Sequence, residues 1–463
     1  MAEEFRDAIF TVDAEGHRRY VHPKRVTKGR FVNPRRITAY ALIAWLFLMP
    51  WLRVNGLPFI QLDVLHRRFI LLGQVFWPQD FHLLVLTMIL GVLSIALFTV
   101  AYGRLFCGWV CPQTIFMEHV FRQIEYWIDG DRNAQIRLRN SPWTWEKIGK
   151  RTAKNGLFLA VSFVISNTFL QYLIGTDAWL GLLTDGPASH WSGFIGIWVF
   201  TGVFFFVFSW FREQVCLIVC PYGRLQGVLL DKNSLVIAYD RIRGELRSRF
   251  RKGEDRAATG KGDCVDCGLC VQACPSGIVI RNGTQLECVS CTACIDVCDS
   301  VMEQTGQEPG LIRYASENEI SSREPWKITP RMKAYGVIVG AVTTLWFALL
   351  LFRAPVEATV LRAPGLMFQD RGTELSNVYT FKVINKTPKD AVLELRLGSP
   401  ASGRLETVGA TSYALPTQGL AKGSLLVYLP KDEVRGSETE LHIEVWVDGQ
   451  MVDVVETQFY GPR

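Results

Sequence analysis

The sequence CVDCGLCVQACP stands at residues 264–275, and a second cysteine-rich run, CVSCTACIDVC, follows at residues 288–298. Both runs have the spacing C-x2-C-x2-C-x3-C, with which bacterial ferredoxins hold [4Fe–4S] clusters. Cysteines three residues apart on a tight loop present three sulfurs to one cluster, and the fourth cysteine of each run ligates the other cluster. Zinc sites usually present two separated C-x2-C pairs instead. These two runs, called the ladders below, therefore predict a redox-active protein with two [4Fe–4S] clusters.

Crossed ligation assigns every ladder cysteine to a cluster. One cluster receives Cys264, Cys267, Cys270 and Cys298, and the other receives Cys288, Cys291, Cys294 and Cys274. All twelve cysteines of the chain precede residue 299. Because cluster ligation needs reduced thiols, we expect the part of the chain that carries them to face a reducing compartment.

The other four cysteines form two segments that resemble each other, GRLFCGWVCP at residues 103–112 and REQVCLIVCP at residues 212–221. Each contains C-x3-C-P and follows an apolar run that is long enough to be a membrane span, as described below. Both cysteine pairs are therefore expected at the same edge of the membrane. Proline after the second cysteine suits a change of direction or the first turn of a new helix. The duplication predicts that four sulfurs, called the cysteine quartet below, meet around a pseudo-symmetry axis. These are Cys107, Cys111, Cys216 and Cys220.

Several chemistries are open to the quartet. Soft thiolates select Cu(I), zinc or an iron–sulfur centre, and two cysteine pairs can also store two electrons as disulfides. Free cysteines also occur simply as small buried hydrophobic residues. We take the quartet as the candidate catalytic site and as the candidate copper ligands, and the sequence leaves open whether it holds copper, a cluster or disulfides.

Five apolar runs predict membrane spans. They are Ile37–Leu52, Phe81–Tyr102, Gly156–Ile174, Gly193–Phe211 and Tyr335–Phe352. The first run has 16 residues, fewer than the roughly 20 that cross a bilayer. Its tryptophans, Trp45 and Trp51, nevertheless favour a span. The histidines His82, His119 and His190 lie near the spans without the spacing of a haem-ligating pair, so we read them as polar or interfacial residues.

The charges of the connecting segments predict an orientation. Lys and Arg number nine in residues 1–37, three in 53–80, nine in 103–155, none in 175–192 and seventeen in 212–333. Loops rich in Lys and Arg stay in the cytoplasm. The N-terminus and the ladders are therefore predicted to be cytoplasmic, whereas residues 354–463, with 11 Lys/Arg and 14 Asp/Glu, are predicted to be periplasmic. The basic residues cluster beside apolar runs, so we expect no nucleic-acid partner.

The tail of the chain alternates apolar and polar residues. Examples are VYTFKV at 378–383, VLELRL at 392–397 and LHIEVWV at 441–447. Alternation of this kind between turn-forming residues indicates half-buried strands, and about 110 residues of it suggest an immunoglobulin-like β-sandwich. We expect this sandwich to be a docking module.

The predicted fold class is a multidomain membrane protein. It combines an α-helical bundle of about five spans, a cytoplasmic 2[4Fe–4S] ferredoxin domain of α+β type and a C-terminal all-β immunoglobulin-like sandwich. The predicted divisions are a basic arm (1–36), a four-span domain with both C-x3-C-P motifs (37–230), a ferredoxin-type domain with a basic linker (231–333), a fifth span (334–353) and the periplasmic domain (354–463).

With these motifs in order, the chain resembles the CcoG family, also called FixG or RdxA, the cytochrome c oxidase accessory proteins of bacteria. The resemblance covers nearly the whole chain, from the basic arm through CGWVCP (107–112), CLIVCP (216–221) and the two ladders to the last span and the tail. The second ladder departs from the simplest ferredoxin pattern because Asp299 stands where proline follows the first.

The resemblance implies a multi-pass protein of the bacterial inner membrane that helps to assemble the cbb3-type haem–copper oxidase, as an oxidoreductase that reduces Cu(II) to Cu(I). The implied route leads from a cytoplasmic electron donor through the two clusters to the quartet and then to copper. Implied partners are membrane lipid and oxidase subunits or copper chaperones. Two alternatives stay open: a quinol-linked membrane electron conduit, and a non-catalytic assembly scaffold.

Overall fold

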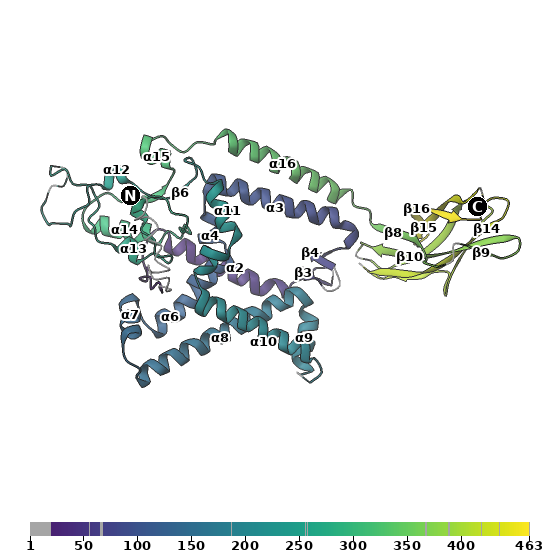
Figure 1. The fold of residues 1–463 in the computed structure, drawn as a ribbon, viewed down its shortest axis with the longest axis horizontal. Helices are drawn as coiled ribbons and strands as arrows, with labels where there is room; N and C mark the ends of the chain where they lie inside the picture. Colours follow the sequence, from purple (N-terminus) through teal and green to yellow (C-terminus); the bar gives the residue numbers. More distant parts are fainter. Residues whose placement is uncertain are drawn as a thin grey trace. The chain divides into compact units, whose positions relative to one another are not determined.

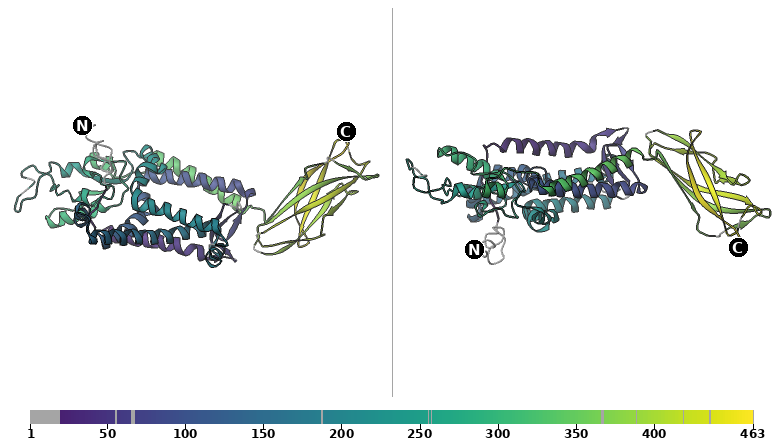
Figure 2. Two further views of the ribbon diagram at one scale, coloured as in Figure 1. Left: turned by 60° about the horizontal axis from the view of Figure 1, so that its bottom comes forward. Right: turned by 90° about the horizontal axis from the view of Figure 1, so that it is seen from above.

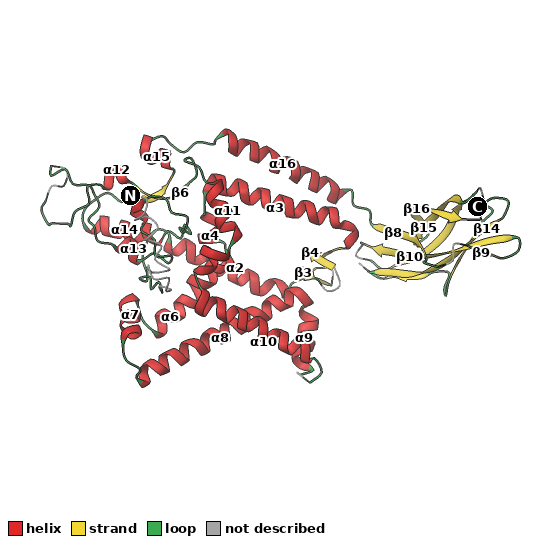
Figure 3. Ribbon diagram, viewed as in Figure 1, coloured by secondary structure: helices red, strands yellow, loops and turns green. Residues whose placement is uncertain are grey.

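The chain folds into two structural units (Figure 1). One consists of Met1–Leu52 and His82–Trp346, and the other of Arg53–Phe81 and Phe347–Arg463. Our computed structural model describes residues 20–54, 56–64, 68–186, 188–254, 256, 258–365, 368–387, 389–417, 419–434 and 436–462. Within these ranges the first unit is mainly helical and the second is mainly β-strand (Figure 3).

Within the described residues, four helices are long and apolar enough to cross a membrane. They are α3 (Phe81–Tyr102), α8 (Trp145–Ile174), α10 (Trp191–Phe206) with the π-helical turn Val207–Phe211, and α16 (Pro330–Leu351). Their most apolar windows have mean hydropathies between 1.8 and 2.7, and about 20 apolar residues suffice to cross the hydrocarbon core. The chain is therefore a membrane protein, and these helices correspond to the second to fifth predicted spans.

The first predicted span lies in helix α2 (Val32–Leu48), which continues into the 3-10 turn Met49–Trp51. Its far end is tied to the end of α8, because the Tyr172 hydroxyl donates to the Leu46 carbonyl at 2.8 Å. Both views in Figure 2 show α2 running along the other long helices of its unit. The helix itself has 17 residues, and its crossing of the membrane stays a prediction.

Short helices connect the spans. They are α4 (Leu105–Trp109), α5 (Pro112–Phe116), the π-helical turn Met117–Phe121, α6 (Arg122–Ile128), α7 (Arg132–Asn140), α9 (Thr176–Thr184), the π-helical turn Val215–Val219 and α11 (Pro221–Leu229). An aromatic core joins the π-helical turn Met117–Phe121 to the long helices: the ring of Phe121 stacks on Phe208, with centroids 4.4 Å apart, and meets Phe158 edge-on. This core fixes the segment that follows the first C-x3-C-P motif.

The ladder region of the first unit is a small α+β fold. Strand β6 (Val236–Tyr239) pairs antiparallel with β7 (Ile312–Ala315). Its helices are α12 (Arg241–Gly244), α13 (Leu269–Gln272), the 3-10 turn Ile280–Asn282, α14 (Ala293–Gln304) and α15 (Glu317–Ser322). Buried side chains such as Ile237, Ile295 and Met302 pack around the cysteines, so the ladders lie inside a hydrophobic core.

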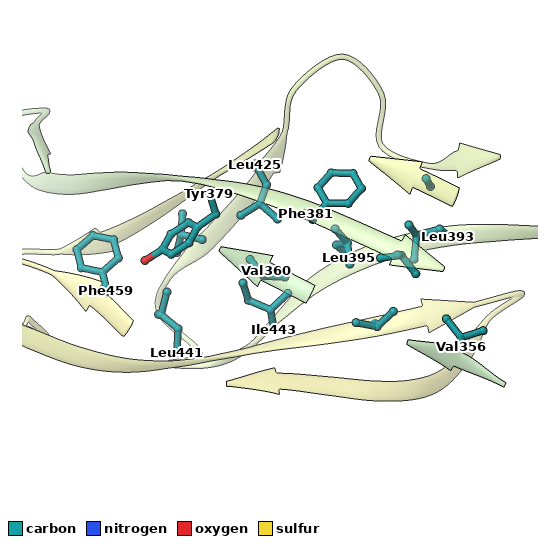
Figure 4. Packing of buried hydrophobic residues seen from close by; sticks show 14 of the residues in the cluster. Val356, Val360, Tyr379, Phe381, Leu393, Leu395, Leu425, Leu441, Ile443 and Phe459 are labelled. Carbon is teal, nitrogen blue, oxygen red and sulfur yellow. The ribbon is translucent and has the colours of Figure 1, made fainter. Parts of the chain in front are cut away.

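The second unit is a sandwich of two antiparallel sheets. One sheet has the order β12-β14-β10-β8, with β9 also paired to β10, and the other has the order β13-β11-β15-β16. The strands are β8 (Val356–Arg362), β9 (Gln369–Asp370), β10 (Glu374–Asn385), β11 (Ala391–Ser399), β12 (Arg404–Thr407), β13 (Tyr413–Leu415), β14 (Leu420–Pro430), β15 (Glu438–Val447) and β16 (Gln450–Tyr460). Alternate residues such as Phe381, Leu425 and Ile443 fill the space between the sheets (Figure 4). The three predicted strand segments are confirmed.

Residues 53–81 belong to this second unit. They form two small antiparallel sheets, from β1 (Arg53–Val54) and β2 (Leu57–Pro58), and from β3 (Ile60–Asp63), β4 (Arg68–Leu71) and β5 (Gln74–Phe76). A 3-10 turn, Pro78–Asp80, precedes α3. Asp80 is 2% exposed and accepts hydrogen bonds from Arg353 and from Lys386, the latter at 2.7 Å. These bonds join the connecting segment to the sandwich.

Candidate metal centres

The ladder cysteines line two adjoining cavities. One cavity is lined by Cys264, Cys267, Cys270 and Cys298. The second is lined by Cys274, Cys288, Cys291 and Cys294 and also by Cys270, which the two cavities share. Most of the remaining lining is apolar, for example Met302 in the first cavity and Ile278 in the second. Four sulfurs around an apolar space are the donor set of a [4Fe–4S] cluster, so the residues present fit this group.

Cysteines of the same set affect one another's pKa values. Burial, and next the thiolate of Cys270, raise the pKa of Cys298 to about 12. Burial is also the main cause that raises the pKa of Cys288 to about 11, with Cys291 adding to it. A raised pKa means that a free thiol is neutral at pH 7. Ligation requires the thiolate, so binding of a cluster releases protons at these sites.

The backbone repeats itself in the two ladders. Asp266 and Gly268 have φ of 49° and 67°, and the equivalent Ser290 and Thr292 have φ of 53° and 64°. Left-handed residues therefore stand on both sides of the second cysteine of each ladder. Three of the four residues are not glycine, and such residues adopt positive φ rarely and mostly where surrounding structure holds them. The two ladders therefore share one local conformation.

The quartet cysteines occupy equivalent places in the two C-x3-C-P segments. Cys111 is the N-cap of α5, with φ −60° and ψ 123°, and Cys220 is the N-cap of α11, with φ −66° and ψ 110°. The following prolines stand at the first helical position, as the sequence predicts. A helix N-terminus carries partial positive charge, which suits a thiolate or an anionic metal–thiolate group.

The two segments interlock. The Cys107 thiol donates to Gln226 Oε1 at 3.5 Å, and Arg104 donates to the Gly223 carbonyl at 2.6 Å. Burial is the main cause that raises the pKa of Cys216 to about 12, and the other three quartet thiolates raise it further. The four thiols therefore lie near enough to interact electrostatically. In the described residues no three Cys, His, Asp or Glu side chains converge on a single metal-ion position, in the quartet or in the ladders.

The quartet adjoins the second ladder through the backbone of Gly108. A Cβ atom on this glycine would lie 2.5 Å from the Ser290 carbonyl oxygen and 2.6 Å from that of Val289. Arg35 bridges the two loops, because its guanidinium donates to the Gly108 carbonyl at 3.3 Å and to the Cys291 carbonyl at 2.8 Å. The first C-x3-C-P loop therefore packs directly on the loop that carries Cys288 and Cys291.

Comparison with known proteins places these features in a family. Protein RdxA of Cereibacter sphaeroides is 33% identical over 441 residues, which cover 90% of this chain and 92% of that protein. The chain belongs to the FixG/RdxA family. Nitrogen fixation protein FixG of Rhizobium meliloti is 33% identical over 83% of this chain and 80% of its own length, and Protein RdxB of Cereibacter sphaeroides is 31% identical over 92% of both.

Family models match three parts of this FixG/RdxA protein. A 4Fe–4S dicluster domain matches residues 211–317, which include Cys216, Cys220 and both ladders. A 4Fe–4S binding domain matches residues 84–134, which include Cys107 and Cys111. The model for the IG-like fold at the C-terminus of FixG matches residues 346–462. The protein is therefore an iron–sulfur electron-transfer protein of the membrane.

Sequence reasoning missed the buried charges behind the quartet. Arg212 is 1% exposed and donates from both terminal nitrogens to Glu125, at 2.6 and 2.8 Å. Lys154 lies 3.7 Å from the same carboxylate. These cations hold the pKa of Glu125 at about 2, although burial, the largest single effect, would raise it. The sequence of this FixG/RdxA chain did contain a signal for a charge near the quartet. An arginine precedes the first cysteine of each duplicated segment, Arg104 before Cys107 and Arg212 before Cys216.

Proposed function

We propose that this protein reduces Cu(II) to Cu(I) at the cysteine quartet and that the Cu(I) serves the assembly of a cbb3-type oxidase. The observation that carries the proposal is the packing of Gly108 against the backbone of Val289 and Ser290, between the ligands of the second ladder. It sets a thiol-rich site beside a cluster-binding loop. The quartet and the ladder are then two parts of one electron-transfer site.

The ladder cysteines are the proposed cluster ligands, in the two sets that crossed ligation predicts; all eight line the two cavities, and Cys270 lines both. When bound, the clusters supply single electrons. Copper is the substrate: each Cu(II) that binds takes up one electron and leaves as Cu(I). Thiolates stabilise this product because soft sulfur prefers Cu(I) to Cu(II). Cys107 and Cys216 must lose their protons to bind the metal, since burial raises the pKa of both thiols.

The electron donor is proposed to approach the first ladder. Cys267 is the exposed member of its set, whereas Cys264 and Cys270 are buried. The preceding segment, residues 246–252, carries Arg247, Arg249 and Arg251. The Ser248 N–H donates to the Cys264 carbonyl at 3.3 Å, which places this segment near the first ladder. Its positive side chains suit a small acidic carrier protein, since complementary charge steers association. This side is proposed to be the cytoplasm of a bacterial cell, and the sandwich is proposed to lie in the periplasm.

The test replaces Cys107 and Cys216 with serine in the full-length protein, purified without oxygen. We expect Cu(I) affinity, measured by competition with a chromogenic chelator, to fall more than about 10-fold, because even partners outside the ligand shell contribute 10–100-fold. Cupric reduction by the dithionite-reduced protein should fall in parallel, while iron content and the [4Fe–4S] absorbance stay unchanged. Val110→Ser, in the same loop and 39% exposed, is the matched control.

Loss of the [4Fe–4S] absorbance together with copper affinity would show that the quartet holds or supports a cluster, which would overturn the copper site. Oxidation of a quinol by the protein without any cupric reduction would favour the quinol-linked conduit. Normal oxidase maturation in cells whose protein carries Cys264→Ser and Cys288→Ser would favour the scaffold, because that role needs no electron transfer.

A further inference from the structure

A basic cavity lies beside the start of α2 and borders the ladders, because Ala273, Pro275, Thr292 and Ala293 also line it. Its walls come from residues 23–26, the first turns of α2, the π-helical turn Met117–Phe121 with α6, and the beginning of α14. Its charged lining consists of Lys24, Arg25, Arg35, Arg36, Glu118 and Asp296. All these elements belong to the first structural unit.

Four cations and two carboxylates line this cavity, so its lining carries a net charge of +2. Glu118 forms an ion pair with Arg122, on the same helical run. Asp296 accepts the backbone N–H of Phe31 at 2.9 Å. In the described part of the chain, neither Lys24 nor Arg36 has an ion-pair partner, and Nη2 of Arg35 is buried without a hydrogen-bond partner. The lining therefore keeps an excess of two positive charges that an anion can neutralise.

The positive charges of the cavity also act on a neighbouring histidine, His119. His119 lines the cavity, and its pKa is lowered to about 3, first by burial and next by the charges of Arg35 and Arg36. Its ring meets Tyr40 edge-on, with centroids 6.3 Å apart. A neutral histidine does not oppose the binding of an anion, and it leaves the charge of the site to the arginines and the lysine.

The apolar surface of α2 begins at the edge of the cavity. Ile37 follows Arg36 directly and is 69% exposed, and Tyr40, one turn further on, is 50% exposed. Further along the helix, Trp45 and Leu48 are more than half exposed as well. A cationic cavity that continues into an exposed apolar helix face fits a ligand with an anionic head and an apolar tail. Basic pockets at the cytoplasmic ends of membrane helices bind lipid headgroups in this way.

We propose that this cavity binds the phosphate of an anionic phospholipid, whose acyl chains run along the exposed face of α2. The charge of the lining favours a phosphate over a neutral headgroup such as a quinone, and the exposed face of α2 favours a lipid over free phosphate. Arg35 also bridges the loops of Cys291 and Gly108. A bound lipid therefore stabilises the junction between the second ladder and the quartet.

The test uses the full-length protein in neutral detergent and three probes: short-chain phosphatidylglycerol, phosphatidylcholine of the same chain length, and inorganic phosphate. Binding is measured by calorimetric titration. We expect saturable binding of phosphatidylglycerol. The double variant Lys24→Gln with Arg36→Gln should weaken it about 30-fold, the factor for loss of two basic residues at an anionic lipid surface. Arg137→Gln, an exposed arginine at the end of α7, is the matched control and should bind like the wild type.

Unchanged iron content and thermal midpoint show that the double variant is folded. Three results would overturn the lipid site: phosphatidylcholine binding as tightly as phosphatidylglycerol, inorganic phosphate binding as tightly as the lipid, or the double variant and Arg137→Gln weakening binding equally. The second of these would identify free phosphate as the ligand. Failure of the copper test leaves this result untouched, because none of the probes is redox-active.

Discussion

Gly108 is the residue on which the proposed electron path depends most directly. It stands between Cys107 and Cys111, and it has no side chain to hold the second ladder away. Its nearest neighbours are backbone atoms of Val289 and Ser290, which cannot rotate aside as the end of a flexible side chain can. A methyl group here must therefore move one loop against the other.

We predict that Gly108→Ala slows cupric reduction while Cu(I) affinity and iron content stay close to wild type. The added Cβ separates the quartet loop from the ladder loop, and overpacking of this kind destabilises by about 1–3 kcal/mol. Stopped-flow oxidation of the dithionite-reduced protein by Cu(II) measures the rate. Gly149→Ala is the control: a Cβ on this glycine of α8 would have no neighbouring atom within 4 Å, so its rate should equal the wild type. Equal rates for both variants would disprove the role of Gly108.

At the scale of single residues, the sequence predicts which cysteines are ligands, but it does not predict which distant residues they contact. The ladder and quartet cysteines follow from spacing and duplication, because each motif carries its chemistry within about ten residues. The contact of Gly108 with Ser290 joins positions 182 residues apart, and the Arg35 bridge to Cys291 spans 256. No local pattern contains such a pair. The glycine is visible in the sequence, but the reason for it appears only when the two loops are seen together.

Among the elements, the segment between α2 and α3 differs most from expectation. The sequence suggests only a connecting loop over residues 53–80. It forms strands of two to four residues, which are too short to show the alternation that predicts the long strands β10, β11 and β15. Its anchor is a buried carboxylate, Asp80, whose partners come from residues 353 and 386. Ion pairs over this separation are likewise invisible in a single sequence.

We predict that Asp80→Asn destabilises the second unit by about 3–5 kcal/mol, the usual cost of leaving buried partners of an ion pair uncompensated. Arg353 and Lys386 would lose their shared counter-charge. Hydrogen exchange of peptides from β8 and β10 in the full-length protein measures the effect. Asp370→Asn is the control, because its pair with Lys431 is about half exposed and such surface pairs contribute about 0–1 kcal/mol.

The same pair predicts a pH dependence. Burial, the largest effect, would raise the pKa of Asp80, but the hydrogen bonds from Arg353 and Lys386 outweigh it and hold this pKa below its usual value of 3.8. A carboxyl with a lowered pKa stabilises the folded state above its unfolded pKa and loses this effect as pH falls. The difference between wild type and Asp80→Asn should therefore be constant from pH 5 to 7 and shrink below about pH 4. A difference that grows on acidification would contradict the assignment.

For the whole molecule, the sequence predicts the order of the parts well. Apolar runs, cysteine spacing and strand alternation are each strong local signals, and four of five spans, the ladder region and the all-β tail correspond to parts of the structure. The remaining question is the number of crossings. Helix α2 alone decides it: with α2 across the membrane, five spans place the two ends of the chain on opposite sides, and without it four spans place them on the same side.

We predict that α2 crosses. With the turn that follows, it extends over Val32–Trp51. Its apolar part begins at Ile37, after Arg35 and Arg36, and a hydrophobic stretch this short can cross where the bilayer thins locally and the flanking side chains reach the interface. Its ends lie at opposite ends of the bundle, since Arg35 meets the ladder loop and the Pro50 carbonyl accepts from Thr176, at the start of α9. Alkaline phosphatase fused at residue 463 should therefore be active and green fluorescent protein fused there dark, whereas green fluorescent protein fused at residue 1 should be bright. A bright fusion at both ends would place α2 in the interface, and the basic cavity would then have to bind lipid from the side of a four-span bundle.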